Sequence, residues 1–278
     1  MSAIPSWERY GTHDESAYPE LWEGCIGAWC PGLGPTGFLW NLAKSGMSPR
    51  PSESGGYDCQ RAWVQTSQGW VLDFYPWANK QLDCGYHGTV RGKTASVVIR
   101  GSWNGTQSGV GYNGYLCGGY GSSSYDLLFL LTTNNPDTAT VWFYGFAGNG
   151  GGVVGRYPGS NKLRNLVGRV YNGATVVDGF MDGVWGGTNG GYSTFQNKDL
   201  PFSIGPNAGS SGYSGYIQNV MLYDTKISEG AIQLLNKEWY APYIRRRPRR
   251  FYSIPTYSTF LPSWARRNHS QLISGGLR

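Results

Sequence analysis

Short strand-like runs that end in two-residue turns fill residues 163–239, and this pattern limits the fold of the chain most strongly. One alternating run ends at Asn172-Gly173 and the next ends at Asp182-Gly183. Both dipeptides tolerate positive φ at little cost, so they favour two-residue hairpin loops between antiparallel strands. We therefore expect successive hairpins in this part of the chain.

The end of the same stretch predicts one more strand and a short helix. Strict alternation over residues 216–223 divides the side chains of the strand between two faces. One face would carry Tyr216, Gln218, Val220 and Leu222, and the other Ile217, Asn219, Met221 and Tyr223. Ser228 is a favourable N-cap for a helix with apolar residues at helical spacing. These apolar residues are Ile232, Leu235 and Trp239.

The order of these parts resembles the C-terminal half of a laminin-G-like domain of the concanavalin-A-like lectin/glucanase superfamily. In that family a V-x-x-Y-N-G…F-x-D-G hairpin precedes a G-x-I-x-x-V-x-x-Y strand, and a short helix follows. Here GYSGYIQNV and ISEGAIQLLNKEW occur in the corresponding order. The resemblance implies an all-β fold, a concanavalin-A-like antiparallel β-sandwich (jelly roll), which we assign to residues 23–240.

The composition agrees with such a fold. The 278 residues include 43 glycines and 42 aromatic residues, and only 14% are charged. A chain of this kind favours many short strands and turns within one large domain. It also lacks an apolar run of about 18 residues, so we expect no membrane-spanning helix and no membrane partner.

The N-terminal half adds strand candidates and glycine-rich segments. Strands are expected at residues 25–29, 94–100, 125–132 and 139–147. Residues 102–124, which are rich in Gly, Ser, Asn and Tyr, predict a loop or a bulged edge strand. Residues 186–193 predict another glycine-rich loop.

The opening of the chain, from YPELWEGCIGAW to LDFYPWANKQLDCG, resembles laminin-G-like proteins encoded by tailed phages and their environmental relatives. A block of the form L-D-F-D-G-x-x-D-Y is usual in those proteins. Asp73 and Asp83 match its acids, but Tyr75 stands in place of the middle Asp. The resemblance would allow a calcium ion. Because that carboxylate is missing, we expect no metal and no other cofactor.

The charge of the chain is unevenly placed. From Ala241 onward there are eight basic residues and no acidic one, whereas the remainder has 15 basic and 17 acidic residues, a balance of −2. Prolines and aromatic residues interleave with the arginines. We therefore expect an extended basic tail at residues 241–278 and an extended N-terminal arm at residues 1–22.

Three roles are open for the basic tail: contact with an acidic protein neighbour, contact with nucleic acid phosphates, or simple solvation. The interleaved aromatic residues favour protein assembly over nucleic acid. The candidate assembly anchors are Arg245, Arg246, Arg247, Arg249, Arg250, Trp264, Arg266 and Arg267.

No catalytic constellation is evident. Retaining glycosidases need two carboxylates about 5–5.5 Å apart. Glucanases of this superfamily carry an E-x-D-x-x-E or E-x-D-x-E strand, but no Glu-x-Asp occurs here. Asp178 and Asp182 are four positions apart at a predicted hairpin, where a structural role is the simpler interpretation. A G-x-S-x-G nucleophile motif is also absent, and we expect a protein that is not an enzyme.

Aromatic residues in the Gly/Asn/Ser-rich segments are the strongest candidates for ligand contact. Flat rings can stack on the apolar faces of sugars, and the same residues also build protein-binding surfaces. Glycan contact, subunit contact and plain packing all stay open for them. The candidates are Trp103, Tyr112, Tyr115, Trp185 and Tyr192.

Five cysteines occur without C-x-x-C spacing. Free, mostly buried thiols in a reducing cytosol are the favoured interpretation. A Cys25–Cys30 or Cys59–Cys84 disulfide is the alternative.

Together these features predict a structural protein of a tailed-phage virion, made in the host cytoplasm and attached to the capsid or tail through its arm and tail. The expected partners are other virion proteins and further copies of the chain, with surface glycans as a candidate ligand. One alternative is a carbohydrate-binding lectin outside any particle, which predicts a shallow aromatic groove. Another is a glycoside hydrolase of the same fold, which predicts two facing carboxylates in a cleft.

Overall fold

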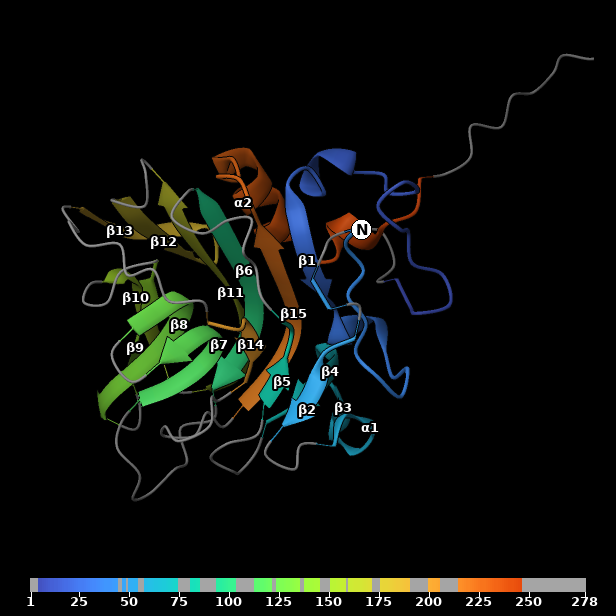
Figure 1. Cartoon of the computed structure of the whole chain (residues 1–278), viewed down its shortest axis with the longest axis horizontal. Coiled ribbons are helices and arrows are strands. Elements are labelled where there is room, and N and C mark those ends of the chain that lie inside the picture. The colour runs from blue at the N-terminus through green and yellow to red at the C-terminus, as the bar shows by residue number, and fades with distance from the viewer. Residues whose placement is uncertain are drawn as a thin grey trace, which may run out of the picture. The chain divides into compact units, whose positions relative to one another are not determined.

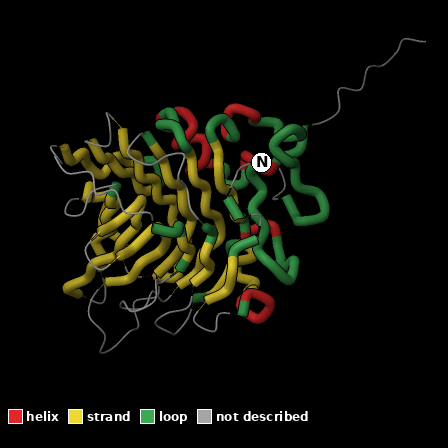
Figure 2. The backbone as a smooth tube through the Cα atoms, viewed as in Figure 1, coloured by secondary structure: helices red, strands yellow, loops and turns green. Residues whose placement is uncertain are grey.

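The structure of the protein is a computed structural model. Antiparallel β-strands dominate its described residues, and the helices among them are few and short (Figures 1 and 2). It describes residues 5–44, 47–48, 50–54, 58–74, 81–85, 94–103, 113–121, 124–135, 138–145, 151–158, 160–171, 176–190, 200–205 and 215–246. In chain order the elements are η1 (Pro19–Leu21), β1 (Cys25–Trp29), η2 (Pro31–Leu33), β2 (Ser52–Ser54), α1 (Cys59–Ala62), β3 (Trp63–Thr66), β4 (Gly69–Asp73), β5 (Gln81–Asp83), β6 (Ala95–Trp103), β7 (Asn113–Gly121), β8 (Ser124–Asn135), β9 (Thr138–Tyr144), β10 (Gly151–Pro158), β11 (Ser160–Tyr171), β12 (Val176–Met181), β13 (Val184–Gly190), β14 (Ser203–Ile204), β15 (Gly215–Tyr223), α2 (Glu229–Lys237) and η3 (Ala241–Tyr243).

The described strands form two sheets. One sheet has eight strands in the order β13-β12-β11-β6-β15-β4-β3, with β1 paired to β15 outside this path. The other has seven strands in the order β10-β9-β8-β7-β14-β5-β2. The pairings at the centre of both sheets are antiparallel. The predicted all-β sandwich is therefore confirmed.

An apolar core fills the space between the two sheets. Val97 and Ile99 of β6 and Leu222 of β15 contribute from the eight-stranded sheet, and Phe129 of β8 and Phe143 of β9 from the other. The ring centroids of the two phenylalanines lie 4.8 Å apart. All five side chains are fully buried. Burial of this core sets which face of each strand points inward.

A second apolar cluster covers the outer face of the eight-stranded sheet. Tyr223 of β15 packs there with Trp22, Tyr243 and the α2 residues Ile232 and Leu235. The indole nitrogen of Trp22 donates a 2.8 Å hydrogen bond to the carbonyl of Pro242. Described parts of both terminal segments therefore pack on the sandwich. The division of the chain at residues 22/23 and 240/241 stays a prediction.

The two terminal segments are joined to each other by backbone hydrogen bonds. Ser16 and Arg245 form an isolated antiparallel bridge. The Ala17 amide donates to the carbonyl of Ile244 (2.7 Å), and the Arg246 amide donates to the carbonyl of Glu15 (2.6 Å). Residues 15–17 and 244–246 therefore lie side by side.

The Asp182-Gly183 turn is confirmed. Both residues have positive φ, +49° and +77°, and Met181 pairs with Val184 across the turn. The Asn172-Gly173 turn lies outside the described residues. The N-cap prediction is also confirmed, because Ser228 Oγ accepts a 3.1 Å hydrogen bond from the amide of Ala231.

The strand predicted at residues 216–223 exists as β15, and its predicted division into faces holds from Asn219 to Tyr223 but fails before Asn219. A β-bulge lies between Ile217 and Asn219. As a result Ile217 joins Val220 and Leu222 in the core between the sheets, whereas Met221 belongs to the outer cluster. A bulge adds one residue to one strand, and strict alternation cannot continue through it.

Two glycine-rich segments also differ from expectation. Part of the predicted loop or edge at residues 102–124 is β7, which lies inside its sheet between β8 and β14. It is bulged on both sides of Cys117, and Gly118 has φ +119°. Part of the loop predicted at residues 186–193 belongs to the edge strand β13. Glycines therefore mark bulges in these strands rather than loops.

All five cysteines are buried free thiols. Burial raises the pKa of Cys30 and of Cys59 to about 12. The same cause raises the pKa of Cys25, Cys84 and Cys117. Within the described ranges, no helix is long and apolar enough to cross a membrane.

Candidate functional site

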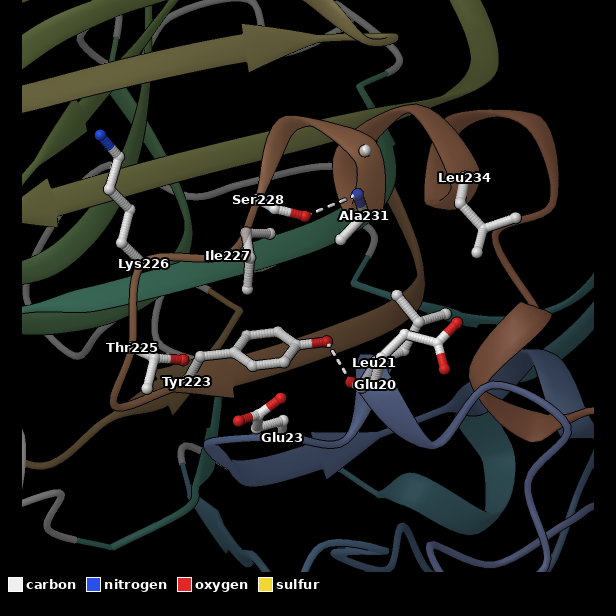
Figure 3. Close-up of a pocket in the computed structure, with 11 residues that line it drawn as sticks. Glu20, Leu21, Glu23, Tyr223, Thr225, Lys226, Ile227, Ser228, Ala231 and Leu234 are labelled. Atoms are coloured by element: carbon white, nitrogen blue, oxygen red, sulfur yellow. Dashed lines mark hydrogen bonds between the residues drawn. The ribbon is translucent and has the colours of Figure 1, made fainter.

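A cavity of about 550 Å³ lies where η1 meets the end of β15 and the start of α2 (Figure 3). We call it the η1–α2 cavity. Its volume is within the range of pockets that hold small ligands. The residues that line it are Glu20, Leu21, Glu23, Tyr223, Thr225, Lys226, Ile227, Ser228, Gly230, Ala231 and Leu234.

Local structure holds the two walls of this cavity in place. The hydroxyl of Tyr223 donates a 2.9 Å hydrogen bond to the carbonyl of Leu21, which fixes η1 to the end of β15 (Figure 3). Burial raises the pKa of the Tyr223 hydroxyl well above its ordinary value, so this donor keeps its proton. On the other wall, the Ser228 cap fixes the first turn of α2.

The lining combines an apolar floor with an acidic rim. Leu21 and Ile227 are buried, whereas Glu20 and Glu23 are exposed. Neither carboxylate has a hydrogen-bond or ion-pair partner among the described residues. The ammonium group of Lys226 lies 3.5 Å from the centre of the Tyr171 ring, and Figure 3 shows this side chain pointing away from both carboxylates. The cavity is therefore amphipathic and carries a local negative charge.

A second, much smaller depression has three tryptophans in its lining, Trp7, Trp40 and Trp63. We call it the tryptophan hollow. Its volume is only about 10 Å³. Trp40 is 38% exposed, and the indole nitrogen of Trp63 is buried with no hydrogen-bond partner among the described residues. The hollow can present flat rings to a ligand, but it cannot enclose one.

Among the aromatic candidates from the sequence, Trp185 is the one whose side chain can be placed. It is 59% exposed on the edge strand β13, next to Val184, which is 70% exposed. Trp103 ends β6 and Tyr115 lies in β7. Tyr112 and Tyr192 lie outside the described residues. None of the five lines the η1–α2 cavity or the tryptophan hollow.

The candidate anchors fall mostly outside the described residues, which include only Arg245 and Arg246 of this set. Arg245 makes an ion pair with Glu15, with Nη2 3.0 Å from both carboxylate oxygens. Its guanidinium therefore holds the two terminal segments together. Arg247, Arg249, Arg250, Trp264, Arg266 and Arg267 are not described.

The acids considered in the sequence have structural partners. Asp178 is buried against Arg169, and Asp182 accepts hydrogen bonds from Arg164 and from the amide of Asn165. Asp73 and Asp83, the two acids considered for calcium, lie on strands of different sheets. Among the described residues, no three His, Cys, Asp or Glu side chains gather as a metal site would require.

Sequence reasoning missed Glu20 and Glu23. They lie in the YPELWEGCIGAW segment at the border of the expected arm, and the resemblance of that segment assigns them no role. The cavity forms only when η1 packs against residues some 200 positions later, as the Leu21–Tyr223 hydrogen bond shows. No local pattern could have indicated that contact.

Searches against family models and against curated proteins returned no match for this sequence. The fold does match solved structures. Trypanosoma rangeli sialidase in complex with sialic acid is 12% identical with a TM-score of 0.53, and the match covers 77% of this chain and 32% of the sialidase. Domain 4 of AbnA, a GH43 extracellular arabinanase from Geobacillus stearothermophilus, in complex with arabinotriose, is 13% identical with a TM-score of 0.52, over 76% of this chain and 98% of that domain. A structure described as a receptor binding domain is 8% identical with a TM-score of 0.56, over 79% and 52% of the two chains.

These likenesses concern the fold, and the matched region is about a third of the length of the sialidase. They overturn one expectation from the sequence. The sequence predicted that this protein is not an enzyme, and that prediction is wrong, because the same fold occurs in a sialidase and in a domain of an arabinanase. The absence of a Glu-x-Asp strand excludes one glucanase motif and cannot exclude enzymes with this fold as a class.

Proposed function

We propose that this protein is a carbohydrate-binding β-sandwich that holds a sugar in the η1–α2 cavity. The observation that carries the proposal is the cavity itself, which joins an apolar floor to two carboxylates that have no partner among the described residues. The likeness to an arabinanase domain in complex with arabinotriose supports it.

Sugar chemistry fits this lining. A pyranose or furanose ring has an apolar face of C–H groups and a periphery of hydroxyls. Ala231 and Leu234, which are half-buried, offer an apolar surface above Leu21 and Ile227, and the carboxylates of Glu20 and Glu23 can accept hydrogen bonds from hydroxyls. Hydrogen bonds to a charged acceptor are about twice as strong as neutral ones.

Isothermal titration calorimetry with arabinotriose and other short oligosaccharides tests this proposal. We expect Glu20→Gln/Glu23→Gln to weaken binding about tenfold or more, since each lost charge-assisted hydrogen bond is worth about 1.5 kcal/mol or more. Glu8→Gln, on an exposed residue outside the lining, is the matched control and should bind like the wild type.

Two further variants locate the site. Trp40→Ala changes the tryptophan hollow, and Trp185→Ala changes the exposed edge of β13. Both should retain binding if the sugar occupies the η1–α2 cavity. Loss of binding in Trp40→Ala with retention in Glu20→Gln/Glu23→Gln would move the site to the hollow and refute the assignment made here.

A finer form of the proposal places the sandwich on a tailed-phage particle, attached through the arginine-rich segment that follows Arg246. The resemblance of the opening residues and the acid-free composition of that segment support it. The test is a deletion that begins at residue 247, because a deletion from residue 241 would remove the buried side chain of Tyr243. The shortened protein should bind sugar normally but fail to join particles, and incorporation at wild-type levels would refute this finer form.

Glycoside hydrolysis in the same cavity is a second candidate function, favoured by the presence of two carboxylates on one rim. Hydrolysis needs one carboxyl group as general acid and a second as nucleophile or base. Release of reducing ends from arabino-oligosaccharides or sialyl-oligosaccharides is the assay. Glu20→Gln and Glu23→Gln should each reduce such activity at least a hundredfold, and activity that survives both changes would not arise from this cavity.

A further inference from the structure

We propose that the η1–α2 cavity selects glycans that carry a free amino group and discriminates against acidic sugars. This inference rests on the proposed function and adds the chemical class of the ligand. It follows from the charges that face the cavity, which differ from what a site for a sialic acid carboxylate would need.

The negative charge of the cavity is uncompensated. Glu20 and Glu23 are exposed and lack partners in the part of the chain that the structure describes. Lys226 is the basic residue of the lining, and its ammonium group is engaged 3.5 Å from the centre of the Tyr171 ring. Because this contact draws the cation away from the two carboxylates, a positively charged ligand gains more from the charge of the cavity than a neutral one.

The start of α2 adds an opposing but smaller effect. A helix N-terminus is equivalent to roughly half a positive charge, whereas the rim carries two full negative charges. Ser228 already satisfies the amide of Ala231. Glu229, in the first turn of the helix, lies 3.8 Å from Nη2 of Arg169, which itself is paired with Asp178. The net potential therefore favours cations.

The rest of the lining favours an amino sugar over a bare metal ion. Calcium takes about 6–8 oxygen ligands, and the lining supplies two carboxylates beside a largely apolar floor. An amino sugar presents an ammonium group and hydroxyls at the rim while its C–H face covers the half-buried side chains of Ala231 and Leu234. Each part of the ligand then meets a surface of matching polarity.

Calorimetry at pH 6 with three trisaccharide-sized probes tests the inference. The glucosamine trimer and its fully N-acetylated form share one backbone and differ in the presence of the cationic amines. Sialyllactose supplies an anionic sugar. We expect the glucosamine trimer to bind the wild type about tenfold more tightly than the acetylated trimer, and sialyllactose to bind more weakly than either.

Two controls establish the cause of this preference. In Glu20→Gln/Glu23→Gln the ratio between the two trimers should fall to about one, and in the wild type it should shrink as salt is raised. Circular dichroism verifies that the variant is folded, as expected for changes at exposed positions. A ratio that persists in the variant would overturn the assignment to these carboxylates.

The possible results distinguish failure of the amino-sugar preference from failure of the proposed carbohydrate binding. Equal binding of all three probes by the wild type would overturn the amino-sugar preference and leave carbohydrate binding intact. Binding of no glycan would overturn the proposed function as well. Binding of a short arginine peptide but of no sugar would show that the cavity takes cationic peptides, and it would overturn both.

Discussion

Arg169 of β11 and Asp178 of β12 face each other across two neighbouring strands and form a buried ion pair. Nε and Nη2 of the guanidinium donate hydrogen bonds of 2.8 and 2.7 Å to the two carboxylate oxygens. Nη1 of Arg169 also donates to the carbonyl of Ile227, 3.1 Å away. The pair therefore ties the sheet to the segment that forms one wall of the η1–α2 cavity.

Asp178→Ala should destabilise the protein by about 3–5 kcal/mol, because the buried guanidinium of Arg169 loses both short hydrogen bonds to a carboxylate and keeps only the exposed Glu229, 3.8 Å away, as an acidic partner. The side chains of the two residues are only 5% and 4% exposed. Urea unfolding followed by tryptophan fluorescence measures the change. Asp224→Ala, at an exposed position, is the control and should shift stability by less than about 0.5 kcal/mol.

Replacing both members of the pair distinguishes the cost of burying an unpaired charge from the loss of attraction between Arg169 and Asp178. Arg169→Met/Asp178→Leu should recover most of the stability that Asp178→Ala loses, since an apolar pair of similar volume avoids desolvating two charges. An Asp178→Ala protein as stable as the wild type would contradict the burial of this pair.

The Glu15–Arg245 contact predicts an acid-sensitive contribution to stability. The hydrogen bond from Arg245 lowers the pKa of Glu15 below its ordinary value of 4.5. Because the folded-state pKa is the lower one, the contribution is complete above pH 4.5 and is lost as the pH falls through the folded-state value. Thermal unfolding of the wild type and Glu15→Gln across pH 3–7 is the measurement. The two curves should converge at the acidic end, and a constant separation would disprove the linkage.

Two glycine-to-alanine substitutions should have opposite effects. A Cβ at Gly168 would lie 2.2 Å from Cγ of Phe143 in the core, so Gly168→Ala should cost roughly 1–3 kcal/mol through overpacking. Gly230 is in α2, and its nearest contact would be Ser228 Oγ at 3.8 Å. Gly230→Ala should therefore stabilise the protein by roughly 0.5–1 kcal/mol. The midpoints of urea unfolding compare both variants with the wild type. A change of stability in the same direction for both variants would contradict the packing of Gly168 against Phe143.

The buried thiols predict slow chemical modification of the folded protein. All five cysteines are buried, and the pKa of Cys30 and Cys59 is raised to about 12. At pH 8 an aromatic disulfide reagent should label the native protein very slowly, since the thiolate is the reactive form. In guanidinium chloride the same reagent should label all five cysteines rapidly. Rapid labelling of the native protein would show that a thiol is accessible.

Local sequence predicted the features that depend on local conformation. The Asp182-Gly183 turn needs two residues with positive φ, and the cap at Ser228 needs one side-chain oxygen. Both can therefore be predicted from the local sequence alone. The alternation of side chains predicted the faces of β15 from Asn219 onward. It could not predict the face of Ile217, because the bulge between Ile217 and Asn219 depends on pairing with β6.

The candidate site depended on contacts between distant segments. The exposure of Trp185 agrees with a residue available for contact, but the cavity arises where η1 reaches β15 and α2. Similarly, the sequence predicts Arg245 as one of several arginines that contact a partner. In the structure it binds Glu15, 230 residues earlier in the same chain. Charge counts along a chain cannot show which acid a given arginine meets.

The antiparallel bridge between Ser16 and Arg245 has a mechanical consequence. In an antiparallel pair, the chain preceding one residue runs beside the chain following the other. A load that pulls Glu15 and Arg246 apart would break the Glu15–Arg246 hydrogen bond first and the Ala17–Ile244 hydrogen bond next. While this contact holds, it carries such a load in place of the strands between Ser16 and Arg245.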